Sequence, residues 1–322
     1  MEISWNIPNP PRSIPTLLIP AVSIGNVPQL CIDLLLHTLP IQNADAVAIL
    51  KSNALIPCIG SSDFNDFDDE AKNEHIRAEN RNQKSTSNKI RSTNLQLFQL
   101  DPNAQTPLYI IQQRSPILQG LASTYAADLA KLIHADLHAT DTVMVLSSPA
   151  SGRRDAQMSR TSIGFHSNGA GSGIEEYSDM RIMMTSHMVR KNSELVHRAK
   201  AMGMGLPEGT DASNTLGWDS SSAREEIATD AEVESMTMPH FFAANRKGSF
   251  VRGFLEACEA LGVSLLIVVV FVHEGDNRMD AVRAASAVSR LLALGSDSQH
   301  AVNWRSPKSW EYLYGARSDL YS

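Results

Sequence analysis

The chain has 322 residues, and its 35 acidic side chains against 28 lysines and arginines give a net charge of -7, which argues against a generic surface for nucleic acids or anionic membranes. Hydrophobic residues make up 43% of the chain, enough for one core of ordinary size, and the longest apolar stretch, residues 263–272, has about half the length of a membrane span. Three cysteines without a CxxC pair indicate neither a disulfide framework nor a thiolate zinc site. We therefore expect a soluble intracellular protein.

Short apolar runs and helical periodicity alternate through the first 146 residues. The run at 16–20 ends in proline and predicts a strand, and the leucines that follow at helical spacing predict a helix over 27–39. Residues 95–100 and 108–112 lie on either side of an Asp-Pro-Asn turn, which favours a β-hairpin. The other elements expected here are strands at 46–50, 55–59 and 142–146 and an amphipathic helix over 116–133.

Two polar stretches interrupt this pattern. Residues 61–94 are rich in acids and then in Lys, Asn, Ser and Thr. Residues 161–236 lack a core-forming pattern over most of their length, apart from a short helix expected near 186–201. Both stretches are predicted to be disordered insertions.

Regular structure resumes with a helix over 249–261, a strand over 263–272 and a helix over 277–294. The strand is almost entirely apolar, as expected for a strand covered on both faces. The last helix is expected to carry its hydrophobic side chains on one face: Met279, Val282, Ala285, Val288, Leu291 and Leu292. These elements predict a three-layer α/β/α sandwich with a mixed sheet. It forms one domain over 1–322, with two insertions and a C-terminal tail, 316–322.

One candidate catalytic cluster follows the most apolar strand and consists of His273, Glu274 and Asp276. Active sites of α/β proteins gather at the carboxyl ends of strands, so this cluster could serve a small-molecule hydrolase or a nucleosidase-like enzyme. The alternative is structural, because Gly275 and Asp276 also fit a turn and an N-cap that open the next helix. An Asp276 carboxylate bonded to the first-turn amides of that helix would favour the cap.

Other candidates for chemistry are weaker. Ser147 and Ser148 follow a buried strand and could supply a nucleophile, but serines after strands are common turn formers. His134 and His138 have the spacing of two zinc ligands on a helix, but no third ligand lies nearby, and histidines at a helix C-terminus interact favourably with its dipole. The sequence therefore predicts no metal or cofactor site.

The last three residues offer a different kind of site. Leu320, Tyr321 and Ser322 place an apolar side chain and an aromatic ring next to a terminal carboxylate, after a polar segment. Such a tail suits capture in a pocket, which would bury both side chains and bind the carboxylate through a lysine or backbone amides. The simpler alternative is an unstructured end without a partner.

Four segments carry a family resemblance. They are residues 18–27 with Gln29, Leu30, Asp33 and Leu34; residues 143–148 with Arg153 and Asp155; residues 272–277 with Asp280 and Ala281; and Trp304 with residues 307–310 and 313–315. In this order and spacing, along roughly 200 residues, the chain resembles the proteasome assembly chaperone 2 family.

The resemblance implies a phosphorylase/hydrolase-like sandwich without that fold's enzymatic site, in which residues 274–277 form a structural turn. It implies a non-enzymatic chaperone that pairs with proteasome assembly chaperone 1 and holds proteasome α subunits while the 20S α-ring closes. The family's tail, a hydrophobic residue, a tyrosine and any residue, maps onto Leu320, Tyr321 and Ser322 and implies docking between adjacent α subunits. A chaperone of this kind is expected in the cytoplasm and also in the nucleus, without nucleic acid, membrane or cofactor as a partner.

Overall fold

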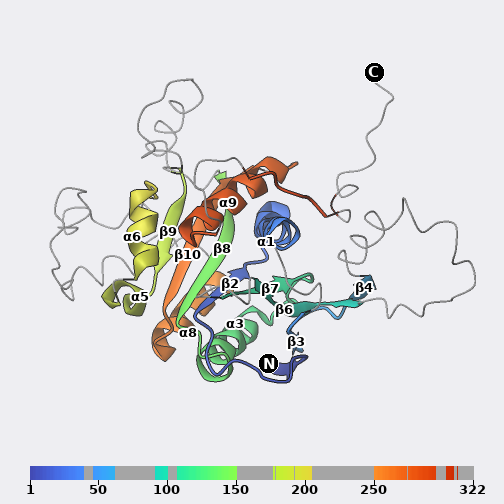
Figure 1. Ribbon diagram of the computed structural model, residues 1–322. Helices are drawn as coiled ribbons and strands as arrows, with labels where there is room; N and C mark the ends of the chain where they lie inside the picture. The colour runs from blue at the N-terminus through green and yellow to red at the C-terminus, as the bar shows by residue number, and fades with distance from the viewer. Residues whose placement is uncertain are drawn as a thin grey trace, which may run out of the picture.

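A mixed β-sheet organises the part of the chain that the computed structural model describes (Figure 1). The described residues are 1–39, 46–61, 91–100, 107–150, 177, 179–191, 193–204, 250–273, 275–294, 302–307 and 310. Within them the main sheet has eight strands. In spatial order these are β1 (Glu2–Trp5), β3 (Ala48–Lys51), β6 (Leu95–Leu100), β7 (Leu108–Gln113), β2 (Thr16–Pro20), β8 (Asp141–Pro149), β10 (Leu265–Val272) and β9 (Arg181–Met184).

Four neighbouring strands, β7, β2, β8 and β10, run parallel, and the remaining pairs are antiparallel. In the parallel part, Val145 of β8 lies opposite Val268 of β10. The expected hairpin is confirmed, since β6 and β7 pair antiparallel with Leu95 opposite Gln113. The predicted mixed sheet is therefore correct.

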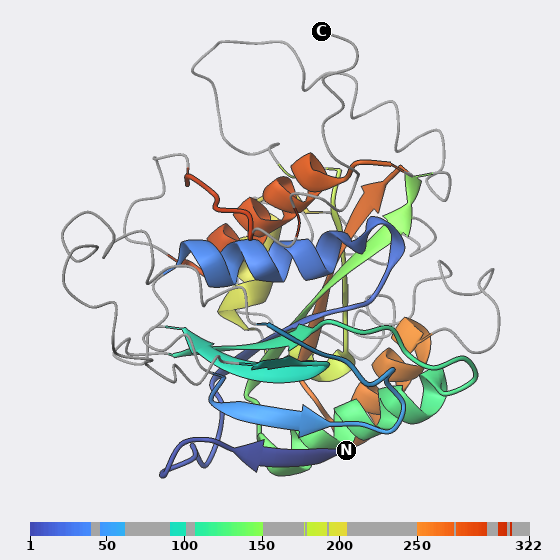
Figure 2. The ribbon, with the colours of Figure 1, turned by 90° about the vertical axis from the view of Figure 1, so that its right-hand side faces the viewer.

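Helices cover both faces of the sheet (Figure 2). On one face α1 (Val27–Thr38) packs against α9 (Arg278–Leu291), and α6 (Glu194–Ala201) packs beside α9. On the other face α3 (Ala122–Lys131), which continues into a π-helical turn at Leu132–Asp136, packs against α8 (Phe250–Leu261). The predicted three-layer α/β/α sandwich is confirmed. In the described residues, no helix is both long and apolar enough to cross a membrane.

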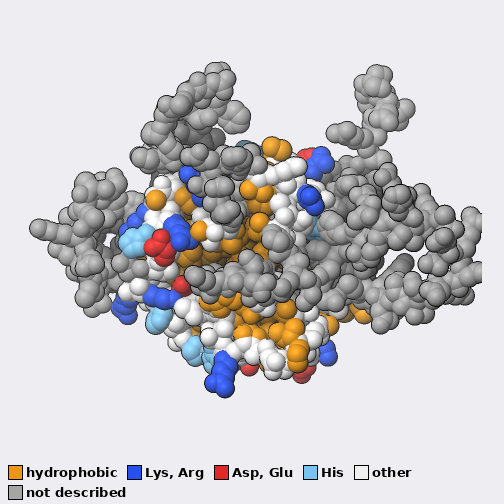
Figure 3. Space-filling view, viewed as in Figure 1, with side chains coloured by type: hydrophobic (Ala, Val, Ile, Leu, Met, Phe, Trp, Pro, Cys, Tyr) orange, Lys and Arg blue, Asp and Glu red, His pale blue; other side chains and the backbone are white. Residues whose placement is uncertain are grey.

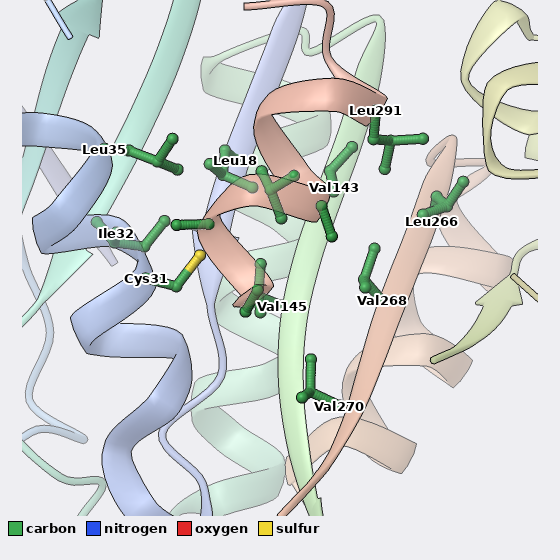
Figure 4. Packing of buried hydrophobic residues seen from close by; sticks show 14 of the residues in the cluster. Leu18, Cys31, Ile32, Leu35, Val143, Val145, Leu266, Val268, Val270 and Leu291 are labelled. Carbon is green, nitrogen blue, oxygen red and sulfur yellow. The ribbon is translucent and has the colours of Figure 1, made fainter. Parts of the chain in front are cut away.

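Alternation along β10 divides the core into two layers. Leu266, Val268 and Val270 belong to the hydrophobic cluster that α1 and α9 cover, as Figure 4 shows. Ile267 and Val269 belong to the cluster on the other face, beneath α3 and α8. Because a strand points successive side chains to opposite faces, its continuous apolar sequence fits burial on both sides, as predicted.

Two elements before residue 122 differ from expectation. The amphipathic helix begins at Ala122 rather than at Pro116, because the preceding chain forms an isolated bridge in which Ile117 lies opposite Leu55. The strand expected over 55–59 is also wrong: Leu55 makes only that bridge, and β4 (Ile59–Ser61) begins where the strand was expected to end. The helical spacing of leucines therefore included residues 116–121, which are not helical and which contain Ile117, the residue that pairs with Leu55.

The predicted insertions are wrong in their described parts. β4 pairs antiparallel with β5 (Arg91–Thr93), so both ends of the stretch 61–94 form strands. Within 161–236, β9 extends the main sheet beside β10, and it is followed by α5 (Ser186–Arg190) and α6, which confirm the helix expected near 186–201. All four residues of β9 are buried. A strand this short has too little periodicity to be predicted. Residues 62–90, 151–176 and 205–249 lie outside the described residues.

The expectation for Met279 is wrong as well, because its side chain is 77% exposed. The buried face of α9 is formed mainly by small side chains, which let the helix lie close to α1: Ala281, Ala284, Ala285, Ala287, Val288 and Leu291. At about 100° per residue, Met279 lies on the side of the helix opposite Ala281 and Val288. The prediction gave large hydrophobic residues more weight than alanines.

Candidate functional site

The carboxyl ends of β2, β8 and β10 meet at one edge of the sheet, because these strands are parallel neighbours. This is the edge at which open α/β sheets usually bind ligands. Ser147 lies near the end of β8, and His273 and Asp276 follow β10. The edge therefore brings together most of the candidate catalytic residues, whereas Glu274 lies outside the described residues.

Ser147 holds the loop after β2 in place. Its amide donates to Oγ of Ser23 at 3.0 Å, and its hydroxyl donates to the carbonyl oxygen of Ile24 at 2.5 Å. The two serine hydroxyls lie 2.8 Å apart. A serine nucleophile would instead donate its proton to a general base. The contacts of Ser147 are thus those of a structural residue that joins β8 to the loop after β2.

Asp276 lies one residue before the N-cap of α9, which is Asn277 and makes no side-chain cap bond. The N-cap predicted at Asp276 is therefore one residue off, although its carboxylate does bond the first amide of the helix. Its Oδ1 accepts hydrogen bonds from the backbone amide of Arg278, the first residue of α9, at 3.1 Å and from Nε of the same arginine at 2.9 Å. The side-chain hydrogen bond from Arg278 holds the pKa of this exposed carboxyl below its usual range. Such a group remains ionised near neutral pH and is poorly suited to general acid–base catalysis there. The contact favours the structural interpretation of the turn.

The turn after β10 also presses against the loop after β2. The side chain of Asn277 is buried, and its Nδ2 donates to the carbonyl oxygen of Gly275 at 3.0 Å. A Cβ atom on Gly25, which has a φ of +69°, would lie 2.9 Å from Cγ of Asn277. Position 25 therefore requires glycine for two reasons: its left-handed backbone conformation and the close approach of the Asn277 side chain.

A second carboxyl at this edge, Asp280 in the first turn of α9, had no predicted role. Burial raises its pKa, while the nearby charges of Arg283 and His273 act in the opposite direction. Arg283 also pairs with Asp179, just before β9, with Nη2 2.5 Å from Oδ1. These charges join α9 to the chain that leads into β9. In the described part of the chain, no three His, Cys, Asp or Glu side chains are grouped as a metal site would need.

A second candidate site lies where the C-terminal segment crosses the helices. Residues 302–307 with Trp310, here called the C-terminal strap, contact α9 and α1. Two hydrogen bonds hold the strap to the helices: from the Trp304 indole to Oγ of Ser286 at 3.0 Å and from the Arg305 amide to Oγ1 of Thr38 at 2.9 Å. Within the strap, the Trp310 amide donates to the carbonyl oxygen of Pro307 at 3.0 Å.

The strap ends on a buried carboxylate of α1. Oδ2 of Asp33 accepts from the Trp310 indole at 2.6 Å, and Oδ1 accepts from Nε2 of Gln112 at 2.5 Å. Asp33 is 3% exposed and Trp310 is 9% exposed. Nε of Arg114 donates to Oε1 of Gln112 at 3.2 Å, which orients the amide so that its NH₂ group faces Asp33. Burial, with the Asp33 carboxylate as a second cause, raises the pKa of the neighbouring Cys31 thiol.

The predicted docking residues, Leu320, Tyr321 and Ser322, lie outside the described residues. Trp310 is the last described residue, so the structure shows how the chain is held just before the tail. In the sequence, Asp33 and Trp310 stood out only as parts of resembling segments, and their contact was not predicted. The signal for Asp33 was present, since it is a lone charge among the apolar residues of α1.

Basic side chains gather on part of the face drawn in Figure 3, although the chain is acidic overall. Lysine, arginine and histidine side chains gather along α5 and α6, as Figure 3 shows, and His187, Arg190 and His197 are exposed there. Part of this charge is paired within the protein: Lys191 lies 2.8 Å from Asp141, and Arg198 forms an ion pair with Glu194. This part of the face is thus partly neutralised by its own neighbours.

Comparison with known proteins relates most of the chain to one family. The model of the PAC2 family matches residues 17–300. A Xenopus laevis protein named proteasome assembly chaperone 2 is 23% identical over 304 residues, which cover 94% of this chain and 93% of that protein. A Danio rerio protein of the same name is 25% identical over 305 residues, which cover 94% of this chain and 92% of that protein.

Two solved structures from Pyrococcus furiosus are also similar. PbaB, an archaeal proteasome activator, has a TM-score of 0.47 and 11% identity and covers 92% of this chain and 91% of its own. PbaA, an archaeal homolog of proteasome-assembly chaperone, has a TM-score of 0.47 and 9% identity and covers 92% of this chain and 83% of its own.

Proposed function

The chain belongs to the PAC2 family, and we propose that it is a non-enzymatic proteasome assembly chaperone. It pairs with proteasome assembly chaperone 1 and binds proteasome α subunits while the 20S α-ring closes. The observation that carries the proposal is the match to relatives named proteasome assembly chaperone 2, which extends over 94% of the chain. We place this activity in the cytoplasm and also in the nucleus.

The contacts at the carboxyl edge of the parallel strands support binding rather than catalysis. Ser147 and Asp276 are engaged by the backbone around them, and the buried amide of Asn277 lies against Gly25. An enzyme of this architecture would instead need acid, base and nucleophile converging on a space for substrate. Ser147 holds the loop after β2 against β8, and Asn277 packs on the same loop at Gly25, which suits a protein that acts through its surface.

The tail supplies the proposed contact with the α-ring. Leu320 and Tyr321 enter a pocket between adjacent α subunits, and the Ser322 carboxylate meets a lysine or backbone amides there. An aromatic side chain next to a charged terminus is a common anchor, because burial of the ring and capture of the charge reinforce each other. A chaperone that occupies this pocket blocks other ligands from it until assembly is complete.

Reconstitution tests the proposal. The chain is co-expressed with proteasome assembly chaperone 1, and the purified product is added to α subunits. We expect a stable heterodimer by size-exclusion chromatography with light scattering, and faster formation of α-rings by native electrophoresis. The matched control is the chain without its last three residues, which should still pair but should promote ring formation less. A chain that neither pairs nor retains α subunits would contradict the proposal.

A further inference from the structure

The carboxylate of Asp33 accepts one of its hydrogen bonds from the strap. It lies inside α1 among buried leucine, isoleucine and cysteine side chains, where an ionised group is costly unless its oxygens are bonded. One oxygen is bonded to Gln112 and the other to the Trp310 indole. Removing the indole would leave one oxygen of a buried carboxylate without this donor. Helix α1 and the strap therefore stabilise each other.

Arg114 fixes which groups donate and which accept in the hydrogen bonds that link it through Gln112 to Asp33. The Arg114 guanidinium donates to the oxygen of the Gln112 amide, so the amide NH₂ group is directed at Asp33. Asp33 must then act as acceptor toward both Gln112 and Trp310. An asparagine at position 33 would present an NH₂ group to one of these two donors, although its shape is almost the same.

We propose that Asp33 is the positioning residue of the C-terminal tail: through Trp310 it fixes the point to which residues 311–322 are attached. The inference deepens the proposed function and rests on it, because it concerns how the same tail reaches the α-ring. The role of Asp33 is indirect, since it contacts the strap and acts on the docking residues only through it.

Anchoring at Trp310 shortens the tether of the tail. From Trp310 to the end of the sequence there are 12 residues, which span at most about 40 Å when extended. If the Trp310 anchor were lost while the Arg305 amide stayed bonded to Thr38, 17 residues would follow the last anchor. Effective concentration falls roughly as the −3/2 power of tether length, so lengthening the tether from 12 to 17 residues would lower it about 1.7-fold for a chaperone whose body is already bound.

The first experiment measures the anchor without the proteasome. Trp310→Phe removes the indole N–H and keeps an aromatic ring, and Trp304→Phe is its matched control, because Trp304 bonds a neutral hydroxyl on α9. Hydrogen exchange is followed at the amide of Trp310. We expect Trp310→Phe to accelerate this exchange at least tenfold and Trp304→Phe to change it much less, with β10 amides unchanged in both. Equal exchange in wild type and Trp310→Phe would overturn the anchor.

A rescue separates positioning from general damage to the fold. Asp33→Asn should accelerate strap exchange as Trp310→Phe does. The double variant Asp33→Asn with Gln112→Glu moves the carboxylate from α1 to β7. The carboxylate introduced at position 112 accepts from Arg114 and from the amide introduced at position 33, and the oxygen of that amide still accepts from the indole. Exchange in the double variant should return toward wild type. No recovery, with a cooperative thermal transition retained, would contradict the relay.

The second experiment measures affinity for α-rings with and without the last three residues. Trp310→Phe and Asp33→Asn should each weaken binding about 1.7-fold in the full chain and have no effect in the shortened chain. If shortening weakens binding but Trp310→Phe does not, tail docking survives and the positioning role is wrong. If shortening has no effect, tail docking itself is wrong, and the positioning role fails with it.

Discussion

Replacing Gly25 with alanine tests the contact between the two loops at the carboxyl edge of the parallel strands. The φ of +69° lies in the left-handed region, where a Cβ atom costs roughly 1–2 kcal/mol. The new Cβ would also displace the buried amide of Asn277 and break its hydrogen bond to Gly275, at a cost of roughly 1–3 kcal/mol. Together these effects should lower the free energy of unfolding by roughly 2–5 kcal/mol.

Gly120 provides the matched control. Its φ is +82°, but a Cβ atom there would meet nothing within 4 Å, so Gly120→Ala should show the backbone cost alone. Urea unfolding of both variants, with the slope m unchanged, measures the difference as a shift in midpoint. Asn277→Ala should remove most of the additional loss in Gly25→Ala, which makes the two substitutions non-additive. If Gly25→Ala is no less stable than Gly120→Ala, the loops do not press on each other.

Three further predictions concern the core and the tail. Val268→Asp buries an unpaired carboxylate in β10 and should cost several kcal/mol; a soluble variant that melts cooperatively near the wild-type temperature would show otherwise. Deleting 177–204 removes β9, α5 and α6 and should abolish cooperative melting, although the sequence pattern predicted a disordered insertion here. A normal melting curve of the shortened protein would contradict this. Tyr321→Ala should weaken α-ring binding by roughly 2 kcal/mol. One glycine added after Ser322 should also weaken binding, because it moves the carboxylate about 3.5 Å. Neither change should alter the melting temperature, and unchanged affinity in the extended protein would exclude carboxylate capture.

Long apolar elements could be predicted because the spacing of their hydrophobic residues indicates which residues are buried. β10 and the hairpin of β6 and β7 follow directly from runs of hydrophobic residues. β1 and β9 were not predicted, since neither contains a hydrophobic run like that of β10: β1 alternates exposed and half-buried residues, and β9 begins with an arginine. The face of α9 was misassigned for a related reason: alanines mark close helix packing only once the partner helix is known.

The candidate sites were predictable to different degrees. The bond from the Arg278 amide to Asp276 is local, and the sequence Gly-Asp-Asn before a helix indicated such a turn, although the N-cap is Asn277 rather than Asp276. The contacts of Asp33 with Gln112 and Trp310 join three distant segments, and no local pattern specifies which donors a buried carboxylate will find. A charged residue inside an apolar helix does indicate that such partners exist.

The contact between Asp33 and Trp310 also sets an order of events during synthesis, because the two residues are 277 positions apart. Helix α1 leaves the ribosome long before the indole is made, so the nascent helix carries a carboxylate that lacks this donor. Contacts this distant in sequence close late, after the local hairpins and helices. The layer formed by α1 and α9 is therefore completed after translation has passed the strap, while the layer on the opposite face can mature earlier.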